Sequence, residues 1–295
     1  MRLLLAMCLG IGMWASALAD PPPVNANPAL WVAHGPAGTV YMLGSIHALP
    51  KNVNWQTPRI LDAVAKSDTF VFEVPMDEDS RTAATDTMRR NALLPMSTSL
   101  VSYFDDKMRE QYRQVIMLTH ANAEPIVYMR PWMAALVLQG VASGAGGFVA
   151  AEGVDNKIYT LASARKGTRF RALETDEVQF RLLMGDGNMD HELALLRATF
   201  ADILKRRDAS MQELFAAWSK GDAKSLARLG PDSQGWTPQA RKALLDDRNR
   251  AWAPQIAAML NEKHTFFITV GAAHLVGKYG VPQLLRAGGY AVDGP

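Results

Sequence analysis

Short apolar segments with the character of β-strands lie near both ends of the chain, and a long stretch of helical pattern lies between them. The expected strands are Leu30–Ala33, Thr39–Leu43, Thr69–Val74, Thr168–Leu173, Thr265–Val270 and Tyr290–Val292. Strands that alternate with helices indicate an α/β fold. We therefore predict a mostly parallel central sheet built from the N- and C-terminal strands, with the largely helical middle region packed on it as a cap or subdomain.

Helices are expected where apolar residues recur every three to four positions. This pattern occurs near 58–67, 81–92, 100–119, 131–143, 153–166, 176–184, 190–207, 210–220, 238–262 and 278–287. The loop Gly35–Gly38 predicts a hairpin between the first two strands. The strands at 39–43 and 69–74 flank a helix, so we expect them to be parallel neighbours. We expect a single domain over residues 29–295, with a helical subdomain at approximately 81–147.

The first 19 residues have the pattern of a secretory signal peptide. A basic start at Arg2 precedes an apolar core, and Ala17-Leu18-Ala19 supplies the small residues that signal peptidase accepts. Residues 20–28 then form a Pro-rich leader. The apolar stretch is shorter than the ~20 residues that a membrane span needs, which disfavours an N-terminal anchor, and no later segment is apolar enough to span. The sequence therefore predicts export to the periplasm or secretion, without a stable membrane span in the mature form.

The single cysteine, Cys8, lies in this signal peptide, so the mature chain is expected to contain none. That excludes disulfides, a thiol nucleophile, and zinc or iron–sulfur sites ligated by cysteine. Any bound metal must be held by His, Asp, Glu or carbonyl oxygen. The 31 basic and 29 acidic residues give a formal net charge of +2, which provides no general electrostatic reason to bind nucleic acid.

The same short motif, Gly-x-x-His, follows the strand at 39–43 and the strand at 265–270. The two copies are Gly44-Ser45-Ile46-His47 and Gly271-Ala272-Ala273-His274. Ligands and catalytic groups of open α/β sheets gather at the carboxyl ends of strands, and glycine there lets the backbone approach a ligand closely. Taken alone, either histidine could instead be an ordinary hydrogen-bonded loop residue.

Two glutamates occupy comparable positions, since Glu73 ends one expected strand and Glu174 follows another. If the strands are parallel, both glutamates meet His47 and His274 at one edge of the sheet. Two imidazoles with one or two carboxylates suit a Zn²⁺, Mn²⁺, Co²⁺ or Fe²⁺ site with open positions. Alternatively, a glutamate at a strand end caps the next helix or pairs with an arginine.

Two further polar segments lie in expected helices. Asp155 lies at the start of a helix, where an acid also favours the positive end of the helix dipole. Arg248 and Asn249 lie inside a long helix. Buried there, they could orient a metal ligand or bind a substrate carboxylate or oxyanion.

In combination, these segments resemble the TraB/GumN family, which is related to the Tiki metalloproteases and more distantly to erythromycin esterase-like and ChaN-like proteins. The resemblance covers about residues 29–294 and rests on Trp31-Val32, Val40–Pro50, the strand ending in Glu73, Arg130-Pro131-Trp132, Glu152–Asp155, Leu173-Glu174-Thr175, Asp247-Arg248-Asn249 and Val270–Gly277. It implies an α/β fold with the two Gly-x-x-His motifs in pseudo-equivalent halves. It also implies a divalent-metal hydrolase site, with His47 and His274 as the paired histidines and Glu73 as the accompanying glutamate. Tiki members are described as Mn²⁺- or Co²⁺-dependent proteases that trim secreted proteins.

We therefore expect an exported hydrolase, a peptidase that uses water activated by Mn, Co or Zn. His47 and His274 would bind the metal with either Glu73 or Glu174, and the remaining carboxylate would activate water. Arg248 would stabilise the developing oxyanion. The residues expected to support these groups are Gly44, Ser45, Gly271, Asp155 and Asn249.

The expected partner is a peptide, protein or small-molecule substrate, and nucleic acid is not expected. Two alternative functions stay open at this point. One is a non-catalytic protein that binds haem or metal, as the ChaN-like relatives suggest. The other is a metal-independent, esterase-like hydrolase in which a histidine acts as the base.

Overall fold

The computed structural model describes residues 23–184, 187–206, 209–229 and 241–295. The expected signal peptide at 1–19, the start of the leader and the first residues of the helix expected at 238–262 lie outside this part of the chain. Among the described residues, no helix combines the length and the apolar character that crossing a membrane requires.

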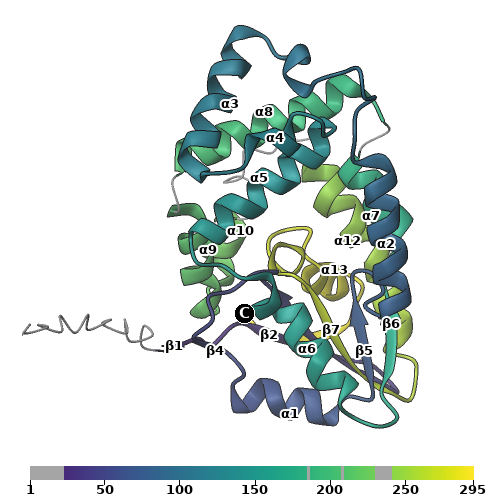
Figure 1. Cartoon of the computed structure of the whole chain (residues 1–295). Coiled ribbons are helices and arrows are strands. Elements are labelled where there is room, and N and C mark those ends of the chain that lie inside the picture. The colour runs from purple at the N-terminus through teal and green to yellow at the C-terminus, as the bar shows by residue number, and fades with distance from the viewer. Residues whose placement is uncertain (1–22, 185–186, 207–208, 230–240) are drawn as a thin grey trace, which may run out of the picture.

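A six-stranded sheet with the order β6-β5-β7-β3-β2-β8 occupies the lower part of the view in Figure 1. Its strands are β2 (Leu30–His34), β3 (Thr39–Ser45), β5 (Thr69–Phe72), β6 (Arg169–Ala172), β7 (Thr265–Gly271) and β8 (Ala291–Asp293). The four strands from β6 to β3 are parallel, whereas β2 is antiparallel to both β3 and β8. A separate parallel pair consists of β1 (Val24–Asn25) and β4 (Val53–Asn54). The predicted α/β class and the predicted hairpin are confirmed.

The expectation that the strands at 39–43 and 69–74 are neighbours is wrong, although they are parallel. β7 lies between them, pairing with β3 along its whole length and with β5 on its other edge. The residues of β7 from Phe266 to Val270 are all buried. A continuous buried run of this kind is typical of a strand covered on both faces. The crossover helix α1 (Pro58–Lys66) contacts β7, so the connection from β3 to β5 passes over one strand position.

Helices occupy most of the remaining described chain. They are α2 (Glu78–Asn91), α3 (Asp106–Thr119), α4 (Ala123–Ile126), α5 (Pro131–Ala145), α6 (Val154–Ser163), α7 (Asp176–Met184), α8 (Met189–Arg206), α9 (Ala209–Ser219), α10 (Ala223–Leu229), α12 (Asp247–Met259) and α13 (Val281–Ala287). Short 3₁₀ turns are η1 (Leu100–Tyr103), η2 (Ala150–Glu152) and η4 (Ala272–Leu275), and the π-turn η3 (Lys242–Asp246) leads directly into α12.

One expected helix, at 100–119, is interrupted. The structure has the 3₁₀ turn η1 first and then the separate helix α3. The break follows from Asp105, whose carboxylate accepts a hydrogen bond of 2.8 Å from the backbone N–H of Met108. An aspartate in this role is a strong N-cap, so α3 starts after it.

Two groups of buried apolar side chains hold the fold together. The larger one surrounds the sheet, where α6 packs on β5 and β7, α12 on β3, and α13 on β2 and β8. The smaller one joins α3, α5 and α8, with Phe104, Tyr112 and Phe200 at mutual ring distances of 5.7–6.1 Å. Figure 1 shows these helices at the opposite end of the view from the strands. The edge of the sheet formed by the carboxyl ends of the parallel strands therefore faces this group of helices.

Candidate functional site

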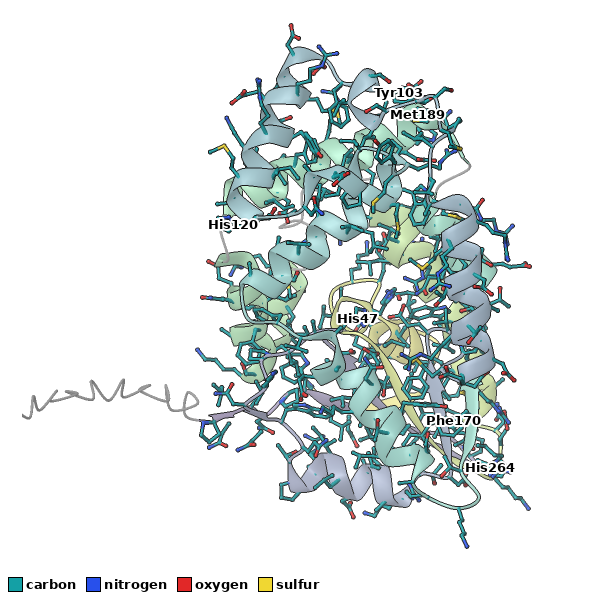
Figure 2. The ribbon with its side chains drawn as sticks, viewed as in Figure 1. His47, Tyr103, His120, Phe170, Met189 and His264 are labelled. Atoms are coloured by element: carbon teal, nitrogen blue, oxygen red, sulfur yellow. The ribbon has the colours of Figure 1, made fainter. Side chains whose placement is uncertain are left out.

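Four sequence-predicted side chains come together where the parallel strands end. His47 follows β3, His274 lies in η4 after β7, and Glu73 and Glu174 follow β5 and β6. The register Ser45↔Gly271 aligns the two Gly-x-x-His segments side by side. Figure 2 places His47 near the middle of the molecule, between the sheet and the upper helices.

The glycine of each motif lies close to a neighbouring part of the site, most tightly at Gly44. A Cβ atom on Gly44 would lie 3.0 Å from the Cα atom of Ala272, so the two motif loops pack backbone against backbone. A Cβ atom on Gly271 would lie 3.3 Å from Glu73 Oε1 and 3.5 Å from His47 Nε2. Its distance from His274 Cδ2 would also be 3.5 Å. Glycine at this position keeps open the space that the polar groups share.

His47 is oriented by Asp155 from the first turn of α6. Asp155 Oδ2 lies 2.8 Å from His47 Nδ1 and also accepts a hydrogen bond from the Ser45 hydroxyl. A carboxylate only accepts, so Nδ1 carries a proton and Nε2 is left for another partner. The attraction to Asp155 raises the pKa of His47 to about 9. The His47 side chain is 69% exposed, so this nitrogen is accessible from solvent.

His274 is oriented by Asn249 from α12. The amide nitrogen of Asn249 donates to the carbonyl of Tyr279 at 2.9 Å, and its Oδ1 lies 2.6 Å from His274 Nδ1. Nδ1 must therefore donate, which leaves a single lone pair on Nε2. Burial lowers the pKa of His274 to about 3, so the ring is neutral at ordinary pH. Arg248 Nη1 lies 3.2 Å from Nε2 and donates to it.

Glu73 is buried and divides its two oxygens between different partners. Oε1 accepts a hydrogen bond of 2.7 Å from the backbone N–H of Gly271 and lies 3.9 Å from His274 Nε2. Oε2 accepts one of 2.6 Å from Arg248. Burial alone would raise the pKa of Glu73, but the neighbouring His274, Arg248 and His47 side chains together lower it to about 2. Glu73 is therefore an anion at neutral pH.

Arg248 contacts most of the other polar groups of the site, and every N–H of its guanidinium has a partner. It forms a two-pronged pair with Glu174 at 2.8 and 3.0 Å, besides its bonds to Glu73 and His274. Its remaining N–H donates to the carbonyl of Leu244 at 3.2 Å. In this arrangement the expected oxyanion role requires Arg248 to release a partner. Glu174 is fully engaged as its counterion rather than facing the shared space.

Trp252 belongs to the site but was not singled out from the sequence. Its indole N–H donates to Glu174 Oε1 at 2.9 Å, its ring lies 4.7 Å from Arg248 Cζ, and its ring centroid lies 4.4 Å from that of His274. Trp252 is completely buried. The available signal was its position four residues after Arg248 on one helix, where the two side chains share a face.

The donors at this edge suit a divalent cation in chemistry and direction. In both histidines Nδ1 donates a hydrogen bond to a side-chain oxygen, as is common in metal-binding histidines. Nε2 is then the ring nitrogen that can meet another partner. His47 Nε2 and Glu73 Oε1 both face the space that a Gly271 side chain would fill. Within the described residues, however, no group of three or more His, Cys, Asp or Glu side chains is arranged to hold a metal ion as it stands. Arg248 occupies the other oxygen of Glu73 and the lone pair of His274.

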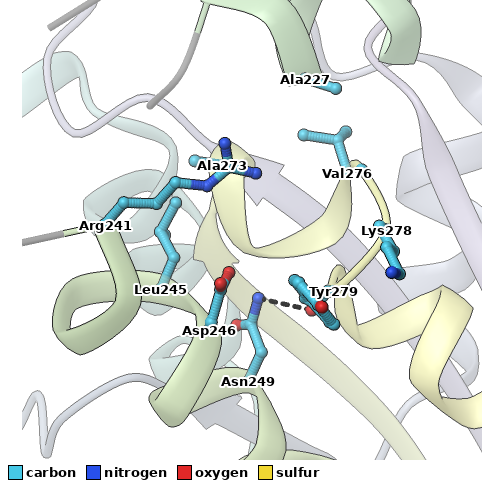
Figure 3. Close-up of a pocket in the computed structure, with 10 residues that line it drawn as sticks. Ala227, Arg241, Leu245, Asp246, Asn249, Ala273, Val276, Lys278 and Tyr279 are labelled. Carbon is cyan, nitrogen blue, oxygen red and sulfur yellow. Dashed lines mark hydrogen bonds between the residues drawn. The ribbon is translucent and has the colours of Figure 1, made fainter. Parts of the chain in front are cut away.

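A small pocket with a cavity volume of about 20 Å³, partly open to solvent, borders Asn249 (Figure 3). Its lining residues are Ala227, Arg241, Leu245, Asp246, Asn249, Ala273, Val276, Gly277, Lys278 and Tyr279. The hydrogen bond from Asn249 to the Tyr279 carbonyl runs along it. Asn249 thus connects this pocket to His274, and none of His47, His274 and Glu73 lines it.

Replacing Gly153 by alanine is expected to lower the free energy of unfolding by about 1–3 kcal/mol, as overpacking does. The new Cβ atom would lie 2.2 Å from the His47 carbonyl oxygen, so α6 and the His47 loop would have to separate. Gly140→Ala is the control, because nothing lies within 4 Å of a Cβ atom at that helical position. Urea unfolding of both variants checks this, and a Gly153→Ala protein as stable as wild type would contradict the close approach.

Comparisons with known proteins cover nearly the whole described chain. The model of the TraB/PrgY/gumN family matches residues 29–294. The chain is 22% identical over 246 residues to YbaP, an uncharacterized protein of Escherichia coli strain K12, which covers 83% of this chain and 87% of that protein. The YbaP protein of Shigella flexneri matches with the same identity and coverage. No solved structure matches significantly.

Proposed function

Because the chain belongs to the TraB/PrgY/gumN family, and because its two Gly-x-x-His motifs meet at one sheet edge, we propose that it is an exported, divalent-metal-dependent hydrolase of the peptidase class. The observation that carries the proposal is the shared space beside Gly271, which His47 Nε2 and Glu73 Oε1 both face. The resemblance to the Tiki metalloproteases favours peptide bonds as substrates. The signal-peptide pattern at residues 1–19 favours action outside the cytoplasm.

In this proposal His47, His274 and Glu73 hold Mn²⁺, Co²⁺ or Zn²⁺. Such a metal, when bound, lowers the pKa of a coordinated water and polarises a substrate carbonyl. Asp155 and Asn249 each accept from Nδ1, so Nε2 is the nitrogen through which both imidazoles would bind a metal. Because the pKa of His47 is about 9, metal binding there releases the proton on Nε2. Glu73 supplies negative charge, because its low pKa keeps it ionised.

The other polar groups have positioning and electrostatic roles. Glu174 balances the charge of Arg248 and is itself held by Trp252, so we assign it as a counterion rather than as the base. Arg248 stabilises a developing oxyanion once one of its N–H groups is released from Glu73 or His274. Ser45 donates a hydrogen bond to the Asp155 carboxylate and so helps to position it beside His47.

A second candidate is a metal-independent hydrolase in which His47 is the general base. Because the pKa of His47 is about 9, only its deprotonated form could accept a proton, and this activity would rise as the pH approaches 9. The favouring observation is the pair of contacts that already satisfies His274 Nε2 and Glu73 Oε2 through Arg248. His47 oriented by Asp155 has the form of a base–orienter pair. In that case Arg248 would have a purely electrostatic role.

Chelation distinguishes the two candidates. The mature protein is treated with a chelator, dialysed, and assayed against unfolded proteins and an ester panel before and after addition of Mn²⁺, Co²⁺ or Zn²⁺. The proposal expects proteolysis that disappears on chelation and returns with one of these ions. Activity that survives complete removal of metal would favour the second candidate. A Soret band on addition of haem, without hydrolysis of any substrate, would contradict both.

A further inference from the structure

The Arg248 side chain is a buried cation placed directly on two of the three proposed metal ligands. It is 12% exposed, and it donates to Glu73 Oε2 at 2.6 Å and to His274 Nε2 at 3.2 Å. A protein cation and a metal cation therefore have overlapping binding partners. Neither stabilising an oxyanion nor stabilising the fold would require Arg248 to contact two of the proposed metal ligands.

At His274, Arg248 and a metal ion would compete for the same lone pair. Its Nδ1 proton is committed to Asn249, so Nε2 has one lone pair, and that lone pair already accepts from Arg248. The same lone pair cannot accept a hydrogen bond and bind a metal at once. A metal at His274 must therefore displace the Arg248 N–H.

Arg248 also has a second anchor that does not involve the proposed ligands. Glu174 takes two of its N–H groups, and the Trp252 ring lies 4.7 Å from its Cζ atom. These contacts keep the guanidinium charge compensated when its bonds to Glu73 and His274 are lost. Without any cation, Glu73 and Glu174 would be two buried carboxylates close to one another, which is unfavourable.

We propose that Arg248 is a resident cation, which holds Glu73 and His274 in place in the metal-free protein and gives them up to a divalent metal while staying paired with Glu174. This inference rests on the proposed function, because it concerns loading of the same site. It assigns Arg248 and Glu174 to metal affinity: Arg248 weakens binding by competing, and Glu174 supports binding by retaining Arg248.

The test is calorimetric titration of Mn²⁺ into chelator-stripped wild-type protein and two variants, Arg248→Gln and Arg248→Lys. We expect Arg248→Gln to tighten Mn²⁺ binding by about 10- to 100-fold, the range over which groups around metal ligands act. Arg248→Lys keeps the charge but cannot donate to Glu73, Glu174 and His274 together, so a smaller tightening is expected. The matched control is Arg250→Gln on the same helix, an exposed charge change expected to alter affinity by less than about threefold.

Each result decides the question. If wild type binds Mn²⁺ and both Arg248 variants bind it equally or more weakly, the inference is overturned while the proposed function stands. If neither wild type nor either variant binds Mn²⁺, Co²⁺ or Zn²⁺, the proposed function fails and the inference with it. Circular dichroism establishes which variants fold. If Arg248→Gln does not fold, the result for Arg248→Lys decides the outcome. If Arg250→Gln tightens Mn²⁺ binding as much as Arg248→Gln does, the effect comes from the change in net charge alone, and the inference is also overturned.

Discussion

Replacing His47 by alanine is expected to reduce hydrolysis by about 10²- to 10⁴-fold while lowering folding stability only slightly. The His47 ring is largely exposed and its neighbours Asp155 and Ser45 keep their mutual hydrogen bond, so the fold loses little. What disappears is Nε2, which both candidate mechanisms use. The measurement is hydrolysis of whichever substrate the chelation experiment identifies, together with thermal unfolding of the variant.

The matched control for this substitution is His120→Asn. His120 is an exposed residue in the left-handed conformation at the end of α3, which asparagine also tolerates, and Figure 2 places it far from His47. Asp155→Asn is informative too, because it keeps the shape but removes the negative charge that orients the His47 ring. A His47→Ala protein with wild-type activity would remove this histidine from the mechanism.

The free energy of unfolding is expected to be greatest near pH 6.5 and to fall on both sides. The pKa of Glu73 is about 2 in the folded protein against an ordinary 4.5, and that of His274 is about 3 against 6.5. As the pH falls below 6.5, the unfolded chain binds more protons than the folded one, so stability is lost. For Glu73 the loss occurs between pH 4.5 and 2 and amounts to about 3 kcal/mol.

The alkaline side of this profile comes from His47. Its pKa is about 9 in the folded protein against an ordinary 6.5, so its pairing with Asp155 stabilises fully below pH 6.5 and is lost as the pH rises to 9. Because the ring is exposed, water screens the attraction, and the alkaline side is expected to be shallower than the acid side.

Guanidinium unfolding at a series of pH values measures this profile. Glu73→Gln is expected to be less stable than wild type at pH 6.5 and to lack the part of the acid loss that Glu73 contributes between pH 4.5 and 2, while keeping the part that His274 contributes. Glu213→Gln, at an exposed position on α9, is the control and should follow the wild-type curve. A wild-type stability that stays constant from pH 6.5 to 3 would contradict the buried, charged environment described for Glu73 and His274.

Much of the architecture could be predicted from the sequence because its signals are local. The apolar strands, the turn residues of the hairpin and the Gly-x-x-His motifs at strand ends each depend on a few adjacent residues. The meeting of His47 with His274 followed from the general rule for parallel strands. The neighbour order did not follow, because the position of β7 between β3 and β5 depends on which strand is covered on both faces, and this is a property of the whole sheet.

The contacts around Arg248 show the second limit of sequence reasoning. The sequence suggested a role for Arg248 only if it is buried, and only the fold shows that it is buried and that Glu73, Glu174 and His274 share its N–H groups. Trp252 was missed because a tryptophan at helical spacing is usually a core residue, and here it is one that also donates to Glu174. Asp155 had a sufficient local explanation at a helix start, which concealed its contact with His47.

The central claim is that His47, His274 and Glu73 together hold one divalent metal ion. The most direct measurement is titration of Mn²⁺, Co²⁺ and Zn²⁺ into chelator-stripped wild-type protein and its His47→Ala variant, which is expected to fold normally. We predict saturable binding of one ion per chain in wild type, and its loss in the variant. Absence of saturable binding in wild type, or equal binding by His47→Ala, would contradict the claim.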